Sequence, residues 1–174
     1  MGELNQSEAS PWALIAPALV LLAAILLLSV PLRLFQGVVP TPILPLAVVF
    51  LYGLYDPRSL PAPVVFAGGL LHDLLYGGPI GPWASVYLLG LVLISGQRTY
   101  FAGRVRDVVW AGFWVVLLVS MIVLWAEMSL LTGAWLPILP AAGQFAVTGL
   151  LYPLCAYAFF ALRARAGVRE EWQV

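Results

Sequence analysis

Apolar residues fill most of the chain in long runs, and the interruptions between the runs are short and rich in Pro, Gly and Arg. An apolar run of about 20 residues is long enough to cross the hydrocarbon core of a bilayer as a helix. Prolines at helix starts and polar turns divide the chain into six such segments. The pattern predicts six helices, at about residues 12–30, 42–55, 61–76, 82–94, 108–131 and 140–162.

The second and third of these helices are short for independent membrane spans. Short helices are typical of a packed bundle, in which neighbouring helices or local thinning of the bilayer absorb the mismatch in length. A glycine-rich turn at 77–81 separates the third helix from the fourth, and a polar loop is expected at 95–107. Pro153 is expected to kink the last helix, because proline removes a backbone hydrogen bond.

Composition places the chain among integral membrane proteins. Of its 174 residues, 63% are hydrophobic and 9% are charged, which is too little polar surface to cover a water-soluble globule. We therefore expect one all-α membrane domain over residues 1–174. Eight basic and eight acidic residues give no net charge, which argues against nucleic acid as a partner. One cysteine, Cys155, excludes a disulfide within the chain.

The arginines are distributed unevenly between the two predicted sides of the membrane. With six spans, seven of the eight fall on the side of the two chain ends, and Arg33 falls on the opposite side. Basic residues gather in cytoplasmic loops. The distribution therefore predicts that both termini lie in the cytoplasm.

Three titratable residues lie in or near the apolar part of the predicted spans. His72 and Asp73 are neighbours, and adjacent helical residues point about 100° apart, so they are not expected to share a metal ion or to act as a base and its orienting group. Glu127 lies roughly 30 Å along the fifth helix, where a solvated carboxylate at a helix end is expected. These residues do not make a catalytic set, and we expect no cofactor, no metal and no enzymatic activity.

Asp73 itself is expected near the middle of the bilayer, where an unpaired ionised carboxylate is costly. We expect it to be protonated, or hydrogen-bonded to helix-end amides or to hydroxyls of a neighbouring span. Two uses remain open. The carboxylate either anchors the turn at 77–81 as a structural bond, or it senses charge or orients a ligand.

Small residues recur at a spacing of four from the third helix into the fourth. Gly77, Gly81 and Ser85 would leave room for another backbone to approach closely. This close approach either packs the chain's own helices or lets a partner's single transmembrane helix dock on the third and fourth helices.

Four groups of residues follow one another in an order found in a known family. They are Pro45 with Leu51-Tyr52, then Gly69-x-x-x-Asp73-x-x-x-Gly77-x-x-x-Gly81, then Trp125-Ala126-Glu127, and finally Gly149-Leu150-Leu151-Tyr152-Pro153 before a basic tail. Together they resemble MreD, the rod shape-determining membrane protein family of bacteria. The resemblance extends over about residues 13–165, and the motif from Gly69 to Gly81 is its most specific part.

The resemblance implies a non-catalytic scaffold of the cell-elongation machinery in the bacterial inner membrane, where it helps to organise peptidoglycan synthesis. The implied direct partner is MreC, which has a single membrane-spanning helix. Through MreC the scaffold would join the glycan polymerase RodA, a class B penicillin-binding transpeptidase and cytoplasmic MreB filaments. The resemblance also implies a fold similar to the substrate-binding S-components of energy-coupling-factor vitamin transporters.

The residues of interest follow from the motif and from the positions around it. Gly69, Asp73, Gly77 and Gly81, together with Ser85, are candidates for a partner-binding or structural element. The secondary candidates are His72, Glu127, Pro45, Tyr152 and Pro153.

A second function remains open, that of a small-molecule-binding membrane subunit of an energy-coupling-factor-type transporter. An intramembrane carboxylate could orient such a ligand. Vitamin sites need several convergent polar groups, and the outward half of the chain offers few beyond Asp73, Gln144 and Glu127. The sequence therefore favours the scaffold.

Overall fold

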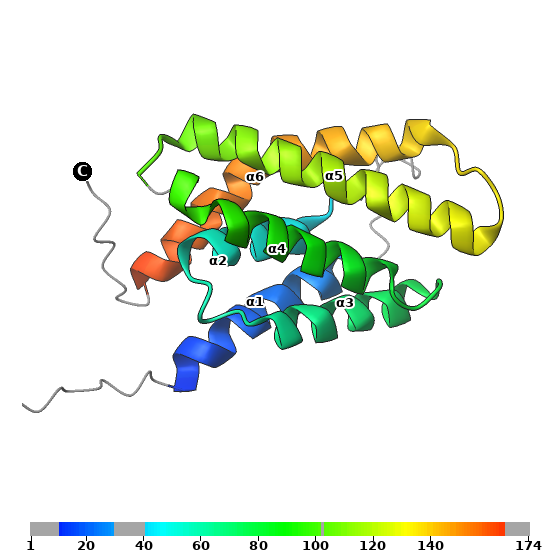
Figure 1. Ribbon diagram of the computed structural model, residues 1–174. Helices are drawn as coiled ribbons and strands as arrows, with labels where there is room; N and C mark the ends of the chain where they lie inside the picture. The colour runs from blue at the N-terminus through cyan, green and yellow to red at the C-terminus, as the bar shows by residue number, and fades with distance from the viewer. Residues whose placement is uncertain (1–10, 30–40, 102, 166–174) are drawn as a thin grey trace, which may run out of the picture.

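The computed structural model describes residues 11–29, 41–101 and 103–165, and these residues form helices joined by short connections, without strands. The prediction of an all-α chain with six helices is confirmed (Figure 1). The helices are α1 (Pro11–Ser29), α2 (Leu44–Tyr55), α3 (Ala62–Tyr76), α4 (Pro82–Phe101), α5 (Arg106–Thr132) and α6 (Ile138–Arg165).

The polar loop predicted at 95–107 is wrong, because α4 continues to Phe101 and α5 begins at Arg106. Two polar residues of this stretch, Ser95 and Arg98, pair with helix backbone. Ser95 Oγ donates a hydrogen bond to the carbonyl of Leu91, one turn earlier in α4, and such pairing lets a polar residue stay helical. Phe101 is buried, and this burial favours keeping the last turn of α4 folded.

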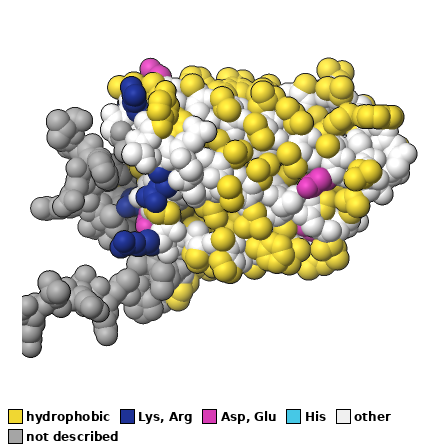
Figure 2. All heavy atoms as spheres, viewed as in Figure 1, with side chains coloured by type: hydrophobic (Ala, Val, Ile, Leu, Met, Phe, Trp, Pro, Cys, Tyr) yellow, Lys and Arg dark blue, Asp and Glu magenta, His cyan; other side chains and the backbone are white. Residues whose placement is uncertain are grey.

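The helices run back and forth between two ends of the bundle (Figure 1). One end carries the start of α1, the α2–α3 and α4–α5 connections and the end of α6. The opposite end carries the turn between α3 and α4 and the connection between α5 and α6. On the face drawn in Figure 2, arginines gather at the first end, while hydrophobic side chains cover most of the remaining length.

Helix α2 lies in the centre of the bundle, in contact with α1, α4, α5 and α6. Nearly all of its side chains are buried, including Pro45 in its first turn, and a helix that is apolar all round is expected to be buried. Phe50 of α2 packs edge-on against Phe113 and Tyr152, whose ring centroids lie 5.2 and 5.7 Å away. Tyr152 is therefore a core residue that joins α6 to α2.

Helices α5 and α6 are long and apolar enough to cross a membrane, over Arg106–Thr132 and Ile138–Ala164. Shorter apolar helices occupy Ile15–Leu27, Leu44–Tyr55 and Ala62–Tyr76. Large apolar side chains are exposed along α6 at Leu150, Leu154 and Tyr157. Extended apolar surface of this kind indicates contact with a membrane or with another protein.

Pro153 lies inside α6 with its side chain exposed. Because proline has no backbone N–H, it cannot pair with the carbonyl of Gly149, four residues earlier. The indole of Trp110 on α5 supplies the missing donor, with its Nε1–H 2.9 Å from that carbonyl oxygen. Gly149 also lies directly against the ring of Trp114. Contacts from Trp110 and Trp114 of α5 therefore join α6 to α5 at the position where Pro153 interrupts the helical hydrogen bonds.

We expect Trp110→Phe to lower the free energy of unfolding by about 1–3 kcal/mol, because it leaves the Gly149 carbonyl without its donor. In a Pro153→Ala background, residue 153 has an N–H that can pair with this carbonyl. Trp110→Phe should then lower the free energy of unfolding by less. Unfolding in detergent micelles, followed by circular dichroism, measures both costs as a double-mutant cycle. The exposed Trp135 provides the control Trp135→Phe. Equal costs of Trp110→Phe in both backgrounds would contradict the role given to Pro153.

Candidate functional site: the corner between α3 and α4

The residues of the Gly69 to Gly81 motif meet at the corner where α3 turns into α4. Asp73, in the last turn of α3, is almost completely buried, with 1% of its surface exposed. Its Oδ2 accepts a hydrogen bond from the N–H of Gly81 at 2.9 Å, and its Oδ1 accepts one from the N–H of Trp83 at 3.0 Å. Both oxygens therefore bind amides at the start of α4, where a carboxylate is favourable. The predicted bonding to helix-end amides is confirmed.

Gly77 and Gly81 shape the turn through their backbone conformation. Gly77 ends α3 with φ of 72°, and its N–H pairs with the carbonyl of Asp73 at 3.1 Å. Gly81 has φ of 122°, and a residue with a side chain rarely adopts such angles. A Cβ at either position would meet open space. Glycine is required here by the turn and not by close packing.

Gly69 is the motif glycine at which two backbones approach. A Cβ built on it would overlap Cα of Ala84 and would lie 2.7 Å from the backbone nitrogen of Ala84. Side chains cannot fit between helices at such a crossing, and glycine permits it. Gly69 therefore sets how closely α3 and α4 pack.

The face of small residues predicted from Gly77, Gly81 and Ser85 differs from the observed geometry. Gly77 and Gly81 lie in the turn, outside both helices, and Ser85 is half-buried against α5. The close contact falls instead at Gly69 and Ala84, within the chain's own bundle. Docking of a partner's helix on α3 and α4 stays a prediction.

Glu127 is joined to α4 through Ser85. The Ser85 hydroxyl lies 2.9 and 2.7 Å from the two carboxylate oxygens of Glu127 and donates a hydrogen bond to this group. Glu127 is half-buried, whereas the sequence predicted a solvated carboxylate at the end of the helix. The pair connects α5 to the corner.

His72 faces a different set of partners from Asp73, as their positions on the helix predict. Its Nδ1 lies 2.6 Å from the hydroxyl of Tyr87, which is fully buried on α4. Its ring stacks on the indole of Trp83, with centroids 4.4 Å apart and an interplanar angle of 28°. His72 therefore belongs to an aromatic cluster between α3 and α4.

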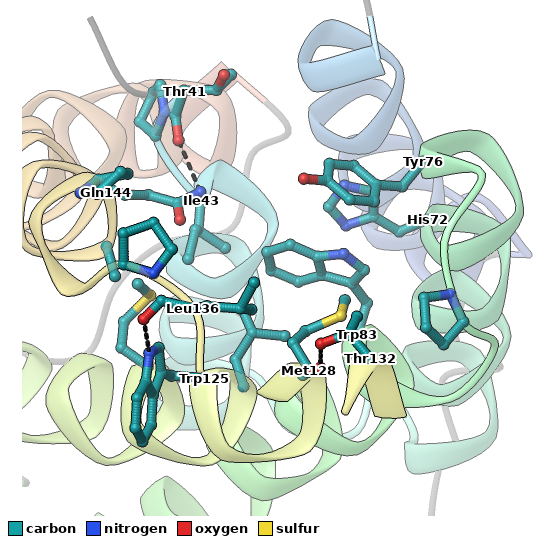
Figure 3. Close-up of a pocket in the computed structure, with 17 residues that line it drawn as sticks. Thr41, Ile43, His72, Tyr76, Trp83, Trp125, Met128, Thr132, Leu136 and Gln144 are labelled. Carbon is teal, nitrogen blue, oxygen red and sulfur yellow. Dashed lines mark hydrogen bonds between the residues drawn. The ribbon is translucent and has the colours of Figure 1, made fainter. Parts of the chain in front are cut away.

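A pocket of about 540 Å³ opens beside this cluster (Figure 3). Its walls come from the residues before α2, from α3 and α4, from the second half of α5 and from the start of α6. His72 and Trp83 form one side, and Trp125 and Gln144 lie on the other (Figure 3). The Gln144 side chain donates to the carbonyl of Thr41 at 2.9 Å, and the indole of Trp125 donates to the carbonyl of Leu136 at 3.1 Å.

Sequence reasoning predicted helix-end amides as the partners of Asp73, but it missed the pocket and the partners of His72. One signal was present. A tight turn between two helices brings the last turns of the first helix beside the first turns of the second, and across the turn at 77–81 this places Asp73 near Trp83 and His72 near Tyr87. The pocket has no comparable signal, because its walls come from five separate parts of the chain.

The chemistry available at the corner is that of structural bonding. Both oxygens of Asp73 accept hydrogen bonds from backbone amides, and Glu127 accepts one from a serine hydroxyl. Among residues 11–29, 41–101 and 103–165, no three His, Cys, Asp or Glu side chains come together as metal ligands would.

Comparisons of the sequence with models of protein families, with curated proteins and with solved structures found no match.

Proposed function

We propose that the chain is a multi-pass protein of the bacterial inner membrane, with the start of α1 and the end of α6 on the cytoplasmic side. Two observations support this placement. Helices α5 and α6 are long and apolar enough to span a bilayer, and arginines gather at the end of the bundle where the predicted cytoplasmic connections lie (Figure 2). The central, fully covered α2 fits a bundle in which short helices are enclosed by longer ones.

Within this membrane the proposed function is a non-catalytic scaffold of the cell-elongation complex, as in the MreD family that the sequence resembles. The observation that carries the proposal is the corner itself. Its carboxylate binds two backbone amides, and Gly69, Gly77 and Gly81 each have a structural reason to be glycine. The Gly69 to Gly81 motif, the most specific part of the resemblance, therefore fixes how α3 joins α4. A fixed shape is what a non-catalytic scaffold needs in order to bind its partners.

The proposed direct partner is MreC, which would bring RodA, the class B penicillin-binding transpeptidase and MreB into the same assembly. The apolar side chains exposed along α5 and α6 suit the bilayer and a partner's membrane-spanning helix equally. Small contributions from many such side chains are sufficient for helices to associate in a membrane.

Affinity purification of the tagged chain from native membranes in a mild detergent tests the proposal. We expect MreC and RodA to be recovered at least about tenfold above their recovery with a tagged, unrelated membrane protein of similar size. A Leu154→Ala variant, which trims one exposed side chain of α6, should be recovered from the membrane in equal amount and serves as a check on folding. Absence of MreC from the wild-type preparation would contradict the scaffold.

The alternative function, a small-molecule-binding subunit of an energy-coupling-factor-type transporter, is favoured by the pocket of about 540 Å³. Ligand sites in proteins have volumes of this order. The same purification distinguishes the two functions, because a transporter subunit would be recovered with an ATPase and its membrane coupling protein.

A further inference from the structure

The walls of the pocket are apolar and uncharged. The residues that line it include three aromatic side chains, Tyr76, Trp83 and Trp125, with Met121, Met128 and several prolines. Its polar side chains are Thr, Gln, His and the hydroxyl-bearing Tyr76, and none of its lining residues is Asp, Glu, Lys or Arg. Moving a charged ligand from water to such a site would cost free energy that no counter-charge offsets.

Trp83 carries a buried hydrogen-bond donor that the protein leaves unused. The side chain is 5% exposed, and its Nε1–H has no acceptor among the residues that the structure describes. The indole lies in the pocket wall beside His72 and below Tyr76 (Figure 3). A buried donor without an acceptor costs about 1–3 kcal/mol, and an oxygen atom of a ligand would remove this cost.

His72 presents a second donor from the same wall. The hydroxyl of Tyr87 is fully buried and lies 2.6 Å from Nδ1 of His72. The tautomer in which this hydroxyl donates to Nδ1 carries the imidazole proton on Nε2. The imidazole stacks on the indole of Trp83, so the two rings lie in adjacent layers of one wall.

We propose that this pocket binds an uncharged molecule with an apolar body and a carbonyl or hydroxyl oxygen that accepts hydrogen bonds from Trp83 and His72. The apolar walls take the body of the ligand, and the two ring donors fix its oxygen. Two sources could supply such a molecule, a neutral glyceride of the bilayer or a soluble uncharged compound. The inference concerns the pocket and does not depend on the proposed partner MreC.

Titrations of the detergent-purified chain, read by native mass spectrometry, test the proposal with two pairs of probes. Dioleoylglycerol and dioleoylphosphatidic acid represent the lipid source, and indole-3-acetamide and indole-3-acetate represent the soluble source. Within each pair the first probe is neutral and the second is charged. We expect one neutral probe to bind with a dissociation constant at least about tenfold lower than that of its charged counterpart.

Two variants close the site in different ways. Trp83→Phe removes the indole N–H but keeps an aromatic ring and the backbone N–H that binds Asp73. Ala141→Phe fills the pocket that Ala141 lines without removing a polar group. We expect each to weaken binding of the neutral probe by about tenfold or more.

Each variant has a matched control in the same chain. Trp110→Phe removes an indole N–H that lies outside the pocket, and Ala142→Phe adds the same ring at the exposed neighbouring position of α6. Both controls should bind as the wild type does. Mass spectrometry of an organic extract of the wild-type protein then identifies any uncharged molecule that is purified with it.

Binding of either neutral probe that depends on Trp83 and Ala141 supports the proposal and names the source. Equal binding by all variants indicates lipid on the outside of the bundle and overturns it. So does a charged probe that binds as tightly as its neutral counterpart. A protein that takes neither neutral probe, and that carries no uncharged molecule after purification, also overturns the proposal.

Discussion

Replacement of Asp73 by leucine is expected to lower the free energy of unfolding by about 2–6 kcal/mol, because it leaves the buried N–H of Trp83 and the part-buried N–H of Gly81 without acceptors. Asp73→Asn keeps one acceptor oxygen and turns its amide group toward the other N–H. The asparagine variant should therefore lose about 1–3 kcal/mol. Unfolding in detergent micelles and the amount of protein in the membrane measure both effects.

The asparagine variant also separates the two uses that the sequence left open for Asp73. If the carboxylate is a structural anchor, the amount of MreC that is purified with the Asp73→Asn variant should be proportional to the amount of folded variant. If the carboxylate senses charge or orients a ligand, the variant would be well folded and inactive, and the structural role would be excluded. The two hydrogen bonds to helix-end amides favour the first outcome.

Replacement of Gly69 by alanine is expected to destabilise the bundle by about 3 kcal/mol, the upper end of the usual cost of overpacking, because the added Cβ would overlap the backbone of Ala84. Backbone atoms at a helix crossing cannot move aside as the end of a flexible side chain can. The loss should appear as failure to accumulate in the membrane, with a lower unfolding temperature of the protein that remains.

Two other glycines provide controls for this substitution. A Cβ on Gly68 would meet the flexible end of Leu21 at 2.9 Å, so Gly68→Ala should cost much less than Gly69→Ala. Gly96 lies in α4 with open space around it, and Gly96→Ala should be neutral or slightly stabilising. Equal effects of all three substitutions would show that the crossing at Ala84 is not what requires glycine.

The sequence predicted the features that depend on neighbouring residues. The six helices follow from apolar runs bounded by Pro and Gly, and the bonding of Asp73 follows from the cost of leaving a carboxylate unpaired near a turn. The end of α4 was mispredicted because Ser95 pairs with its own helix. A count of polar residues cannot distinguish such a helix end from a loop.

Contacts between distant parts of the chain could not be predicted in the same way. The indole of Trp110 meets the carbonyl freed by Pro153 across two helices, and the pocket needs α3, α4, α5 and α6 in place before it exists. Glu127 has its hydrogen-bond partner in Ser85, which lies 42 residues away. Such pairings depend on how the helices cross, and helix crossings are set by packing.

The short sequence distance across the corner bears on how the protein enters the membrane. Asp73 binds residues 8 and 10 positions later, so its partners are synthesised almost immediately after it. Contacts this local form quickly and do not wait for distant segments. In the proposed membrane placement, α3 and α4 can therefore leave the translocation machinery as a pre-formed hairpin, with the carboxylate already shielded when it first meets lipid. A ribosome stalled after α4 should yield a hairpin that is integrated before α5 has been made.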